Sequence, residues 1–358
     1  MRIVFDAYEL VRGQGKSIGI YNYAKNLLHA MAENLPPPIE ISVLCNGVNL
    51  ADFTTGHPRI IPICVQSSAP SKTQRLIWHF GAAAWRIKSM NADWYFSPKG
   101  FCPFGVKLGS PKTRTAVVIH DLIPLWYAEH FPGHFGRLEE LFINRSLTAS
   151  AKYADKIIAI SQATAADIEA RTGRRRGLKV IYNGIPFRSP GPRPHPEPYL
   201  FAMASLLPHK NAQGVLAAYQ AYRSLVDQPL PLMLCGVPDV RETGVTSITG
   251  VYDSDLHAYY AHTELFIFLS RAEGFGFPPV EALSHGARVL CSDLPVLREV
   301  TRNLAEYTPL DDANKIGAKI AEIIDKEDFH AQRVLRQKIL EVYSWQACAR
   351  QLFEFITE

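Results

Sequence analysis

Short apolar runs recur along the whole chain, and each is followed by a segment long enough for a helix. Seven of these runs lie in the first half, at 2–5, 39–45, 59–63, 93–97, 115–120, 156–161 and 179–183. Four lie in the second half, at 199–205, 230–236, 264–270 and 287–292. Because buried parallel strands are apolar throughout and are joined by helices, this pattern predicts parallel α/β sheets covered by helices on both faces.

Residues 186–198, PFRSPGPRPHPEP, interrupt the alternation with six prolines that exclude regular helix or strand. We therefore expect an interdomain linker at 188–198, between one Rossmann-like, doubly wound domain over 1–187 and a second over 199–343. The last segment has the amphipathic pattern of a helix, which is expected within 344–358.

Composition restricts the class of protein. The 358 residues are 47% hydrophobic and 20% charged, as in ordinary globular domains, and the formal net charge of +4 is too small to indicate a nucleic-acid partner. No apolar run is as long as a membrane span, and residues 1–20 lack the apolar core of a signal peptide. The six scattered cysteines are typical of a reducing compartment, so a cytoplasmic location is expected.

Residues 270–286, SRAEGFGFPPVEALSHG, carry the most informative candidate chemistry. Glu273 follows the apolar run 264–270, and Glu281, eight positions later, is expected in the first turn of a helix over 280–285. Both carboxylates would then lie at the carboxyl edge of a parallel sheet, where open α/β sheets bind ligands and helix N-termini favour anions. A tight turn or a helix dipole would explain either part alone, but a purely structural loop needs only one such device.

The same block resembles the signature of glycosyltransferase family 4, E-G-F-G-x-P-x-x-E-A, and meets every fixed position of it. This family consists of retaining enzymes of the GT-B fold, in which two Rossmann-like domains face each other across a cleft and a terminal helix packs back on the first domain. The resemblance implies that Glu273 holds sugar hydroxyls as a catalytic group and that Glu281 binds the ribose diol. It also assigns substrate binding to the intervening loop, Gly274, Phe275, Gly276 and Phe277.

The segment ASLLPHKN, at 204–211, resembles the loop of the family that meets the donor diphosphate. Lys210 matches its catalytic lysine, which would neutralise charge on the leaving nucleotide. Ser205 and His209 stand where the family often has an arginine, so the second cation is not evident from this loop.

Three positions in the first half resemble family sites more weakly. Gly19 matches the glycine-containing turn before the first helix, although Tyr21 replaces a second glycine, and Lys16 and Ser17 could add contacts. His120, at the end of an apolar run, resembles the histidine that contacts the donor sugar in mannosyltransferase-like members. Asn183 resembles the asparagine of the family's N-G turn before the linker and is a candidate substrate-binding residue, and an ordinary turn explains it at least equally well.

The resemblance implies transfer of a hexose from a nucleotide-diphosphate sugar to a saccharide or lipid-linked saccharide, with no other cofactor and no metal. GDP-mannose is the first donor expected, and a UDP-sugar or another GDP-hexose is the alternative. The D-x-D at 253–255 is interpreted as a helix cap rather than a metal site. The alternative from another class is a non-catalytic protein that binds a nucleotide sugar or acts as a scaffold. The presence of Glu273, Glu281, Lys210 and His120 together argues against this alternative.

The basic and aromatic residues of 71–94 fit either a helix packed on the core or a face that contacts a membrane. Because family acceptors are often lipid-linked, peripheral contact with the inner face of the cytoplasmic membrane stays open beside the structural interpretation. The basic cluster within 171–179 is expected to be a solvated loop, with lipid contact as the alternative.

Overall fold

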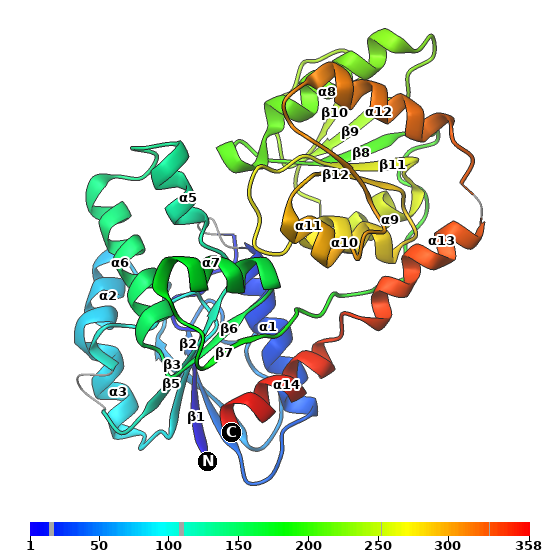
Figure 1. The fold of residues 1–358 in the computed structure, drawn as a ribbon. Coiled ribbons are helices and arrows are strands. Elements are labelled where there is room, and N and C mark those ends of the chain that lie inside the picture. Colours follow the sequence, from blue (N-terminus) through cyan, green and yellow to red (C-terminus); the bar gives the residue numbers. More distant parts are fainter. Residues whose placement is uncertain (14–17, 107–110, 252, 329) are drawn as a thin grey trace. The chain divides into compact units, whose positions relative to one another are not determined.

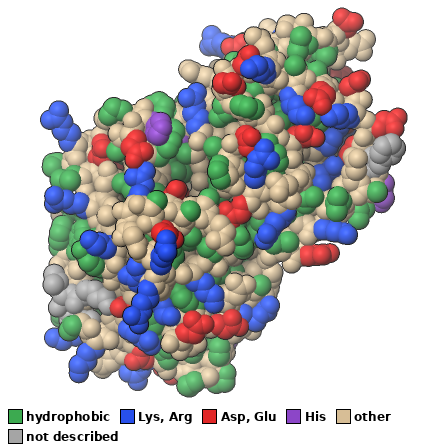
Figure 2. Space-filling model, in the orientation of Figure 1, with side chains coloured by type: hydrophobic (Ala, Val, Ile, Leu, Met, Phe, Trp, Pro, Cys, Tyr) green, Lys and Arg blue, Asp and Glu red, His purple; other side chains and the backbone are tan. Residues whose placement is uncertain are grey.

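The computed structural model describes residues 1–13, 18–106, 111–251, 253–328 and 330–358, with side chains left out at 253 and 254. These residues form two compact units (Figure 1). Unit 1 comprises Met1–Gly184 and Ser344–Glu358, and unit 2 comprises Ile185–Tyr343. In the view of Figure 2, Lys and Arg side chains are interspersed with Asp and Glu over the visible face of each unit.

Unit 1 is built on a seven-stranded sheet in the order β3-β2-β1-β4-β5-β6-β7, and every pair of neighbours is parallel. Its strands are β1 (Arg2–Asp6), β2 (Glu40–Asn46), β3 (Ile60–Gln66), β4 (Trp94–Ser97), β5 (Arg114–Ile119), β6 (Lys156–Ala159) and β7 (Leu178–Val180). Each predicted run in the first half overlaps one of them. The helices are α1 (Ile18–Glu33), α2 (Lys72–Ile77), the π-helix η1 (Trp78–Ala82), α3 (Ala83–Ser89), α5 (Ile123–His130), α6 (Arg137–Tyr153), α7 (Gln162–Thr172) and α14 (Trp345–Thr357).

The C-terminal helix α14 completes unit 1 by packing against α1 (Figure 1). The rings of Tyr23 and Trp345 lie 5.5 Å apart between the two helices. Gly184, in the segment after β7, allows the chain to pass close to the start of α14, because a Cβ atom there would lie 2.3 Å from the backbone nitrogen of Trp345. The end of the chain is therefore a structural part of the unit that its beginning forms.

Unit 2 contains a parallel six-stranded sheet in the order β10-β9-β8-β11-β12-β13. Its strands are β8 (Leu200–Met203), β9 (Leu232–Cys235), β10 (Val245–Ile248), β11 (Leu265–Phe268), β12 (Val289–Ser292) and β13 (Glu306–Thr308). The two edge strands, β10 and β13, were not predicted, because both are short and partly exposed and so lack a continuous apolar run. The helical elements are η2 (Pro208–Lys210), α8 (Ala212–Leu225), α9 (Asp253–His262), α10 (Phe277–Ser284), α11 (Pro295–Val300), α12 (Ala313–Asp325), α13 (His330–Gln337) and η3 (Lys338–Glu341).

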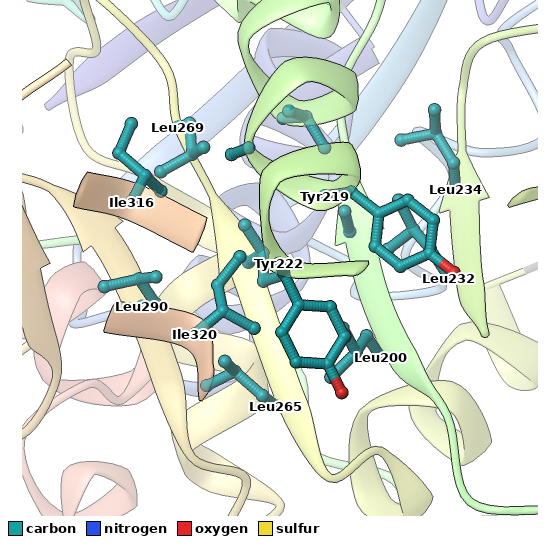
Figure 3. Packing of buried hydrophobic residues seen from close by; sticks show 14 of the residues in the cluster. Leu200, Tyr219, Tyr222, Leu232, Leu234, Leu265, Leu269, Leu290, Ile316 and Ile320 are labelled. Atoms are coloured by element: carbon teal, nitrogen blue, oxygen red, sulfur yellow. The ribbon is translucent and has the colours of Figure 1, made fainter. Parts of the chain in front are cut away.

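The core on one face of this sheet lies under α8 and α12 (Figure 3). Tyr219 and Tyr222 of α8 and Ile320 of α12 pack over apolar side chains of the strands, among them Leu200 and Leu265. All five residues are at most 2% exposed. This packing fixes α8, and with it the loop between β8 and α8, relative to the sheet.

The proline-rich segment 186–198 has no helix or strand and lies within unit 2. The ring of Phe187 stacks on His285 at 5.0 Å, and Arg193 lies 3.7 Å from the Glu264 carboxylate. The chain divides between the units after Gly184, a few residues before this segment.

Candidate active site

The sheet of unit 2 reverses its strand order between β8 and β11. β8 is the first strand of the unit, β9 and β10 extend the sheet on one side, and β11 to β13 extend it on the other. The chains leaving the carboxyl ends of β8 and β11 therefore diverge, and such a switch point is where open α/β sheets bind ligands. The loops that carry Lys210 and Glu273 both begin there.

Backbone and side-chain hydrogen bonds join these two loops. The backbone N–H of Arg271 donates to the His209 carbonyl at 2.7 Å, and the Asn211 side-chain Nδ2 donates to the Leu269 carbonyl at 2.9 Å. Asn211 has a φ of 55°, in the left-handed region that asparagine tolerates better than most residues. Gly214 provides room for it, since a Cβ there would lie 2.4 Å from the Asn211 amide nitrogen.

Lys210 and Glu273, taken from separate parts of the sequence, form an ion pair at this edge. Lys210 Nζ lies 2.6 Å from Glu273 Oε1. The lysine side chain is 28% exposed and the glutamate side chain only 8%. A cation that solvent can reach thus lies beside a mostly buried carboxylate, an arrangement that can offer positive charge to an anionic group and hydrogen-bond acceptors to neighbouring hydroxyls.

The helix after the Glu273 loop begins earlier than predicted. α10 starts at Phe277, so Glu281 lies in its second turn, and the prediction that it lies in the first turn was wrong. Proline is tolerated near a helix start because the N–H groups there have no partner within the helix, so Pro278 and Pro279 are included. Gly276 precedes the helix with a φ of 89°, and a Cβ there would lie 2.6 Å from Leu297.

Tyr260 holds the carboxylate of Glu281. Its hydroxyl donates to Glu281 Oε2 at 3.1 Å, and the tyrosine, in α9, is fully buried. The sequence analysis did not single out Tyr260, because a buried tyrosine in a helix has no distinguishing local pattern. The contact orients one oxygen of Glu281, whose side chain is partly exposed at this edge.

The remaining predicted residues of unit 2 line the same loops. Ser205 Oγ accepts a hydrogen bond from the Leu207 N–H at 3.4 Å. Phe275 is 2% exposed, and its ring packs 5.0 Å from Phe277 and 5.4 Å from Tyr343, so its side chain fixes the loop on the core. Gly274 is also buried.

Three predicted residues belong to unit 1. His120 directly follows β5, is 6% exposed, and hydrogen-bonds through Nε2 to the Pro98 carbonyl at 2.7 Å. Burial lowers the pKa of His120 to about 4, against a smaller opposing effect of this hydrogen bond, so the imidazole is neutral at physiological pH. Gly19 is exposed in the first turn of α1. Asn183 is fully buried, and neither polar atom of its amide has a hydrogen-bond partner among the described residues.

Sequence reasoning missed a buried charged cluster at the switch point of unit 1, between β1 and β4. Lys99, 6% exposed, lies 2.8 Å from Asp6 Oδ2 and also contacts the Glu9 carboxylate, which His79 approaches at 3.6 Å. Burial by itself would raise the pKa of Glu9, but Lys99 and His79 lower it to about 2. The cluster joins β1, η1 and the loop after β4, so no single stretch of sequence indicates it.

Some predicted features fall outside the described residues, namely Lys16, Ser17 and the side chains of Asp253 and Ser254. Across the side chains that the structure does describe, no group of three or more His, Cys, Asp and Glu converges as metal ligands. In the basic cluster, Arg171 pairs with Glu129 at 2.9 Å and Arg174 donates to backbone carbonyls of unit 1.

Two parallel α/β units, one of which has polar groups paired at the switch point of its sheet, are the architecture expected of the GT-B fold. Residues 19–188 match the family described as Glycosyltransferase Family 4, and residues 186–338 match Glycosyl transferases group 1. The chain belongs to glycosyltransferase family 4, as its signature predicted.

Known proteins agree with this assignment. The O-antigen chain mannosyltransferase RfbU of Salmonella typhimurium is 24% identical over 327 residues, which cover 86% of this chain and 88% of that protein. Sucrose-phosphate synthase from Thermosynechococcus elongatus has the same fold, with a TM-score of 0.74 at 16% identity over 99% of this chain and 98% of the other. Anabaena HepE, solved in complex with UDP and glucose, gives a TM-score of 0.69 at 16% identity over 100% and 99% of the two chains. The predicted GT-B fold is confirmed.

Proposed function

We propose that this chain is a retaining hexosyltransferase that moves mannose from GDP-mannose to a hydroxyl of a saccharide or lipid-linked saccharide during assembly of a cell-surface polysaccharide. The observation that carries the proposal is the Lys210–Glu273 pair at the switch point of unit 2. It places a cation suited to a leaving diphosphate beside a carboxylate suited to the hydroxyls of the sugar being transferred.

The proposed donor-binding groups act by charge and hydrogen bonding. Lys210 neutralises the diphosphate as the bond to the anomeric carbon breaks, which lowers the barrier because the charge develops there. Glu273 accepts hydrogen bonds from sugar hydroxyls, and Glu281, oriented by Tyr260, accepts them from the ribose diol. The backbone of Gly274 and Gly276 lets the donor lie close to the loop.

Unit 1 supplies the remaining groups in this proposal. His120, neutral and buried, offers an imidazole edge to the sugar, and Gly19 offers an exposed helix start without a side chain. The acceptor hydroxyl attacks on the face that the diphosphate leaves, and the donor phosphate takes its proton. This front-face route retains the anomeric configuration and uses no protein nucleophile.

Mannose is favoured over other sugars because the full-length relative RfbU is named an O-antigen chain mannosyltransferase. A UDP-sugar donor is the alternative, which the complex of HepE with UDP and glucose supports. Fluorescence thermal shift against GDP-mannose, GDP, UDP-glucose and UDP separates the two, because a ligand that binds only the folded state raises its melting temperature. A rise with guanine nucleotides alone supports the proposal, and a rise with uridine nucleotides alone refutes the GDP-mannose donor.

We further propose that unit 1 rests on the inner face of the cytoplasmic membrane through helices 72–89. No helix in the described ranges is long and apolar enough to cross a membrane. Exposed apolar side chains nevertheless occur here, with Ile77 at 58%, Phe80 at 64% and Trp85 at 70%, between the exposed Lys72 and Lys88. Such a surface suits anionic lipid headgroups. Sedimentation with phosphatidylglycerol vesicles, compared with neutral vesicles, tests this contact.

A further inference from the structure

The diphosphate site of unit 2 has little net positive charge if Lys210 alone supplies it. A diphosphate carries several negative charges at neutral pH, whereas Lys210 is already paired with Glu273 at 2.6 Å. The start of α10 also offers few backbone N–H groups to an anion, because Pro278 and Pro279 in its first turn have none. A second cation at this edge would therefore change the electrostatics of the site substantially.

Arg271 lies where such a second cation would be needed. It follows β11, two residues before Glu273, and its backbone N–H donates to the carbonyl of His209, the neighbour of Lys210. Its side chain is directed to the same loop, since Nε and Nη2 lie 3.2 and 3.1 Å from Asn211 Oδ1. The guanidinium is thus held within hydrogen-bonding distance of the residue that follows Lys210.

The hydrogen bonds to Asn211 do not neutralise the charge of Arg271. Asn211 is neutral, and among the described residues no carboxylate lies within ion-pair distance of the guanidinium. Asn211 is itself fixed by its bond to the Leu269 carbonyl and is only 6% exposed, so it provides a rigid anchor. Arg271 is exposed, and a guanidinium retains further N–H donors after two are used.

We propose that Arg271 is a second diphosphate-binding residue of the donor site, acting with Lys210 and positioned by Asn211. The inference rests on the proposed function, because it requires a nucleoside diphosphate as ligand. Arginine suits this role since its planar donors bind phosphate oxygens in pairs and its charge persists at any physiological pH. Arg271 lies in the loop after β11, so the loop after β8 does not have to contain the second cation.

Titration calorimetry of GDP, UDP and the corresponding monophosphates against Arg271→Gln and Arg271→Lys tests the inference. Glutamine can still donate to Asn211 but has no charge, whereas lysine keeps the charge without the two-pronged bond. Arg271→Gln is expected to weaken diphosphate binding about 10- to 100-fold, with a smaller loss for the monophosphate and a shallower salt dependence, and Arg271→Lys to recover part of it. Arg241→Gln, an exposed arginine in the same unit, is the matched control and should bind like the wild type.

Diphosphate binding by Arg271→Gln equal to that of the wild type would overturn the inference and leave the proposed function intact. A glutamine variant that binds better than the lysine variant would also overturn it, because the side chain would then act only through Asn211. A wild-type protein that binds neither GDP nor UDP would refute the proposed function itself. The melting temperature of each ligand-free variant shows whether it folds, and the lysine variant keeps the test valid if the glutamine variant does not.

Discussion

Replacing Glu273 by glutamine should separate sugar transfer from nucleotide binding. The substitution keeps the shape of a side chain that is 8% exposed and removes the charge that lies 2.6 Å from Lys210 Nζ. In the proposed site this carboxylate binds sugar hydroxyls, so Glu273→Gln should impair turnover. Lys210 would lose its counter-charge and become more available to the diphosphate.

The size of each effect follows from the contacts. Hydrogen bonds to a charged group contribute about 1.5–3 kcal/mol, so losing one of them in the transition state lowers turnover about 10- to 150-fold. The ion pair with Lys210 is partly exposed, and its loss should destabilise unit 2 by only about 1 kcal/mol, or ~2–4 °C in melting temperature. The variant should therefore fold and bind GDP at least as tightly as the wild type.

The assay measures transfer from radiolabelled GDP-mannose, or release of GDP, beside calorimetric binding of GDP. Glu264→Gln is the matched control, because Glu264 precedes β11 at the amino edge of the sheet and pairs with Arg288 at 3.5 Å. Turnover of Glu273→Gln within a factor of two of the wild type would refute the assignment of Glu273. A parallel loss of GDP affinity would show that Glu273 acts on the nucleotide rather than on the sugar.

Three further outcomes are expected. Tyr260→Phe should weaken nucleoside diphosphate binding about 3- to 10-fold, because Glu281 loses the donor that orients it, and unchanged affinity by calorimetry would contradict that role. Turnover should persist in excess EDTA, since Lys210 and Arg271 are proposed to meet the diphosphate charge, and recovery only on addition of Mg²⁺ or Mn²⁺ would count against this. The free energy of unfolding should fall by a few kcal/mol as the pH drops from about 6.5 to about 4. Burial lowers the pKa values of His120 and His285 in the folded protein from 6.5 to about 4, so between these pH values the unfolded state binds protons that the folded state does not. Urea melts across this pH range should show a shallower loss for His120→Gln, and an identical profile would refute the burial argument.

The sequence alone predicted those elements of the fold that have a pattern within one short stretch of residues. Continuous apolar runs predicted the inner strands, because a strand buried on both faces has no polar alternation to obscure it. The edge strands β10 and β13 were missed for the opposite reason, since exposed polar residues such as Thr246 and Glu306 interrupt the apolar pattern. The helix was predicted to start at 280, whereas α10 starts at Phe277, because two consecutive prolines are as typical of a turn as of a helix start.

The candidate site could be predicted only where its residues form one motif. Glu273 and Glu281 share a signature, so both were found, but their partners come from distant segments. Lys210 and Tyr260 meet these carboxylates across 63 and 21 positions of sequence, and the Arg271–Asn211 contact spans 60. A single sequence does not record such proximity, which the strand order of the sheet creates.

The return of α14 to unit 1 makes unit 2 an insertion within a discontinuous unit. The insertion begins at Ile185 and ends at Tyr343, and these two residues are joined by a hydrogen bond of 3.5 Å from backbone N–H to backbone carbonyl. A unit whose two chain ends lie together can be produced as a separate chain without interrupting its own hydrophobic core. Residues 185–343 should therefore fold when produced alone, whereas residues 1–184 alone would expose the apolar face of α1 that α14 covers, and would need 344–358 supplied as a separate peptide or joined by a short bridge.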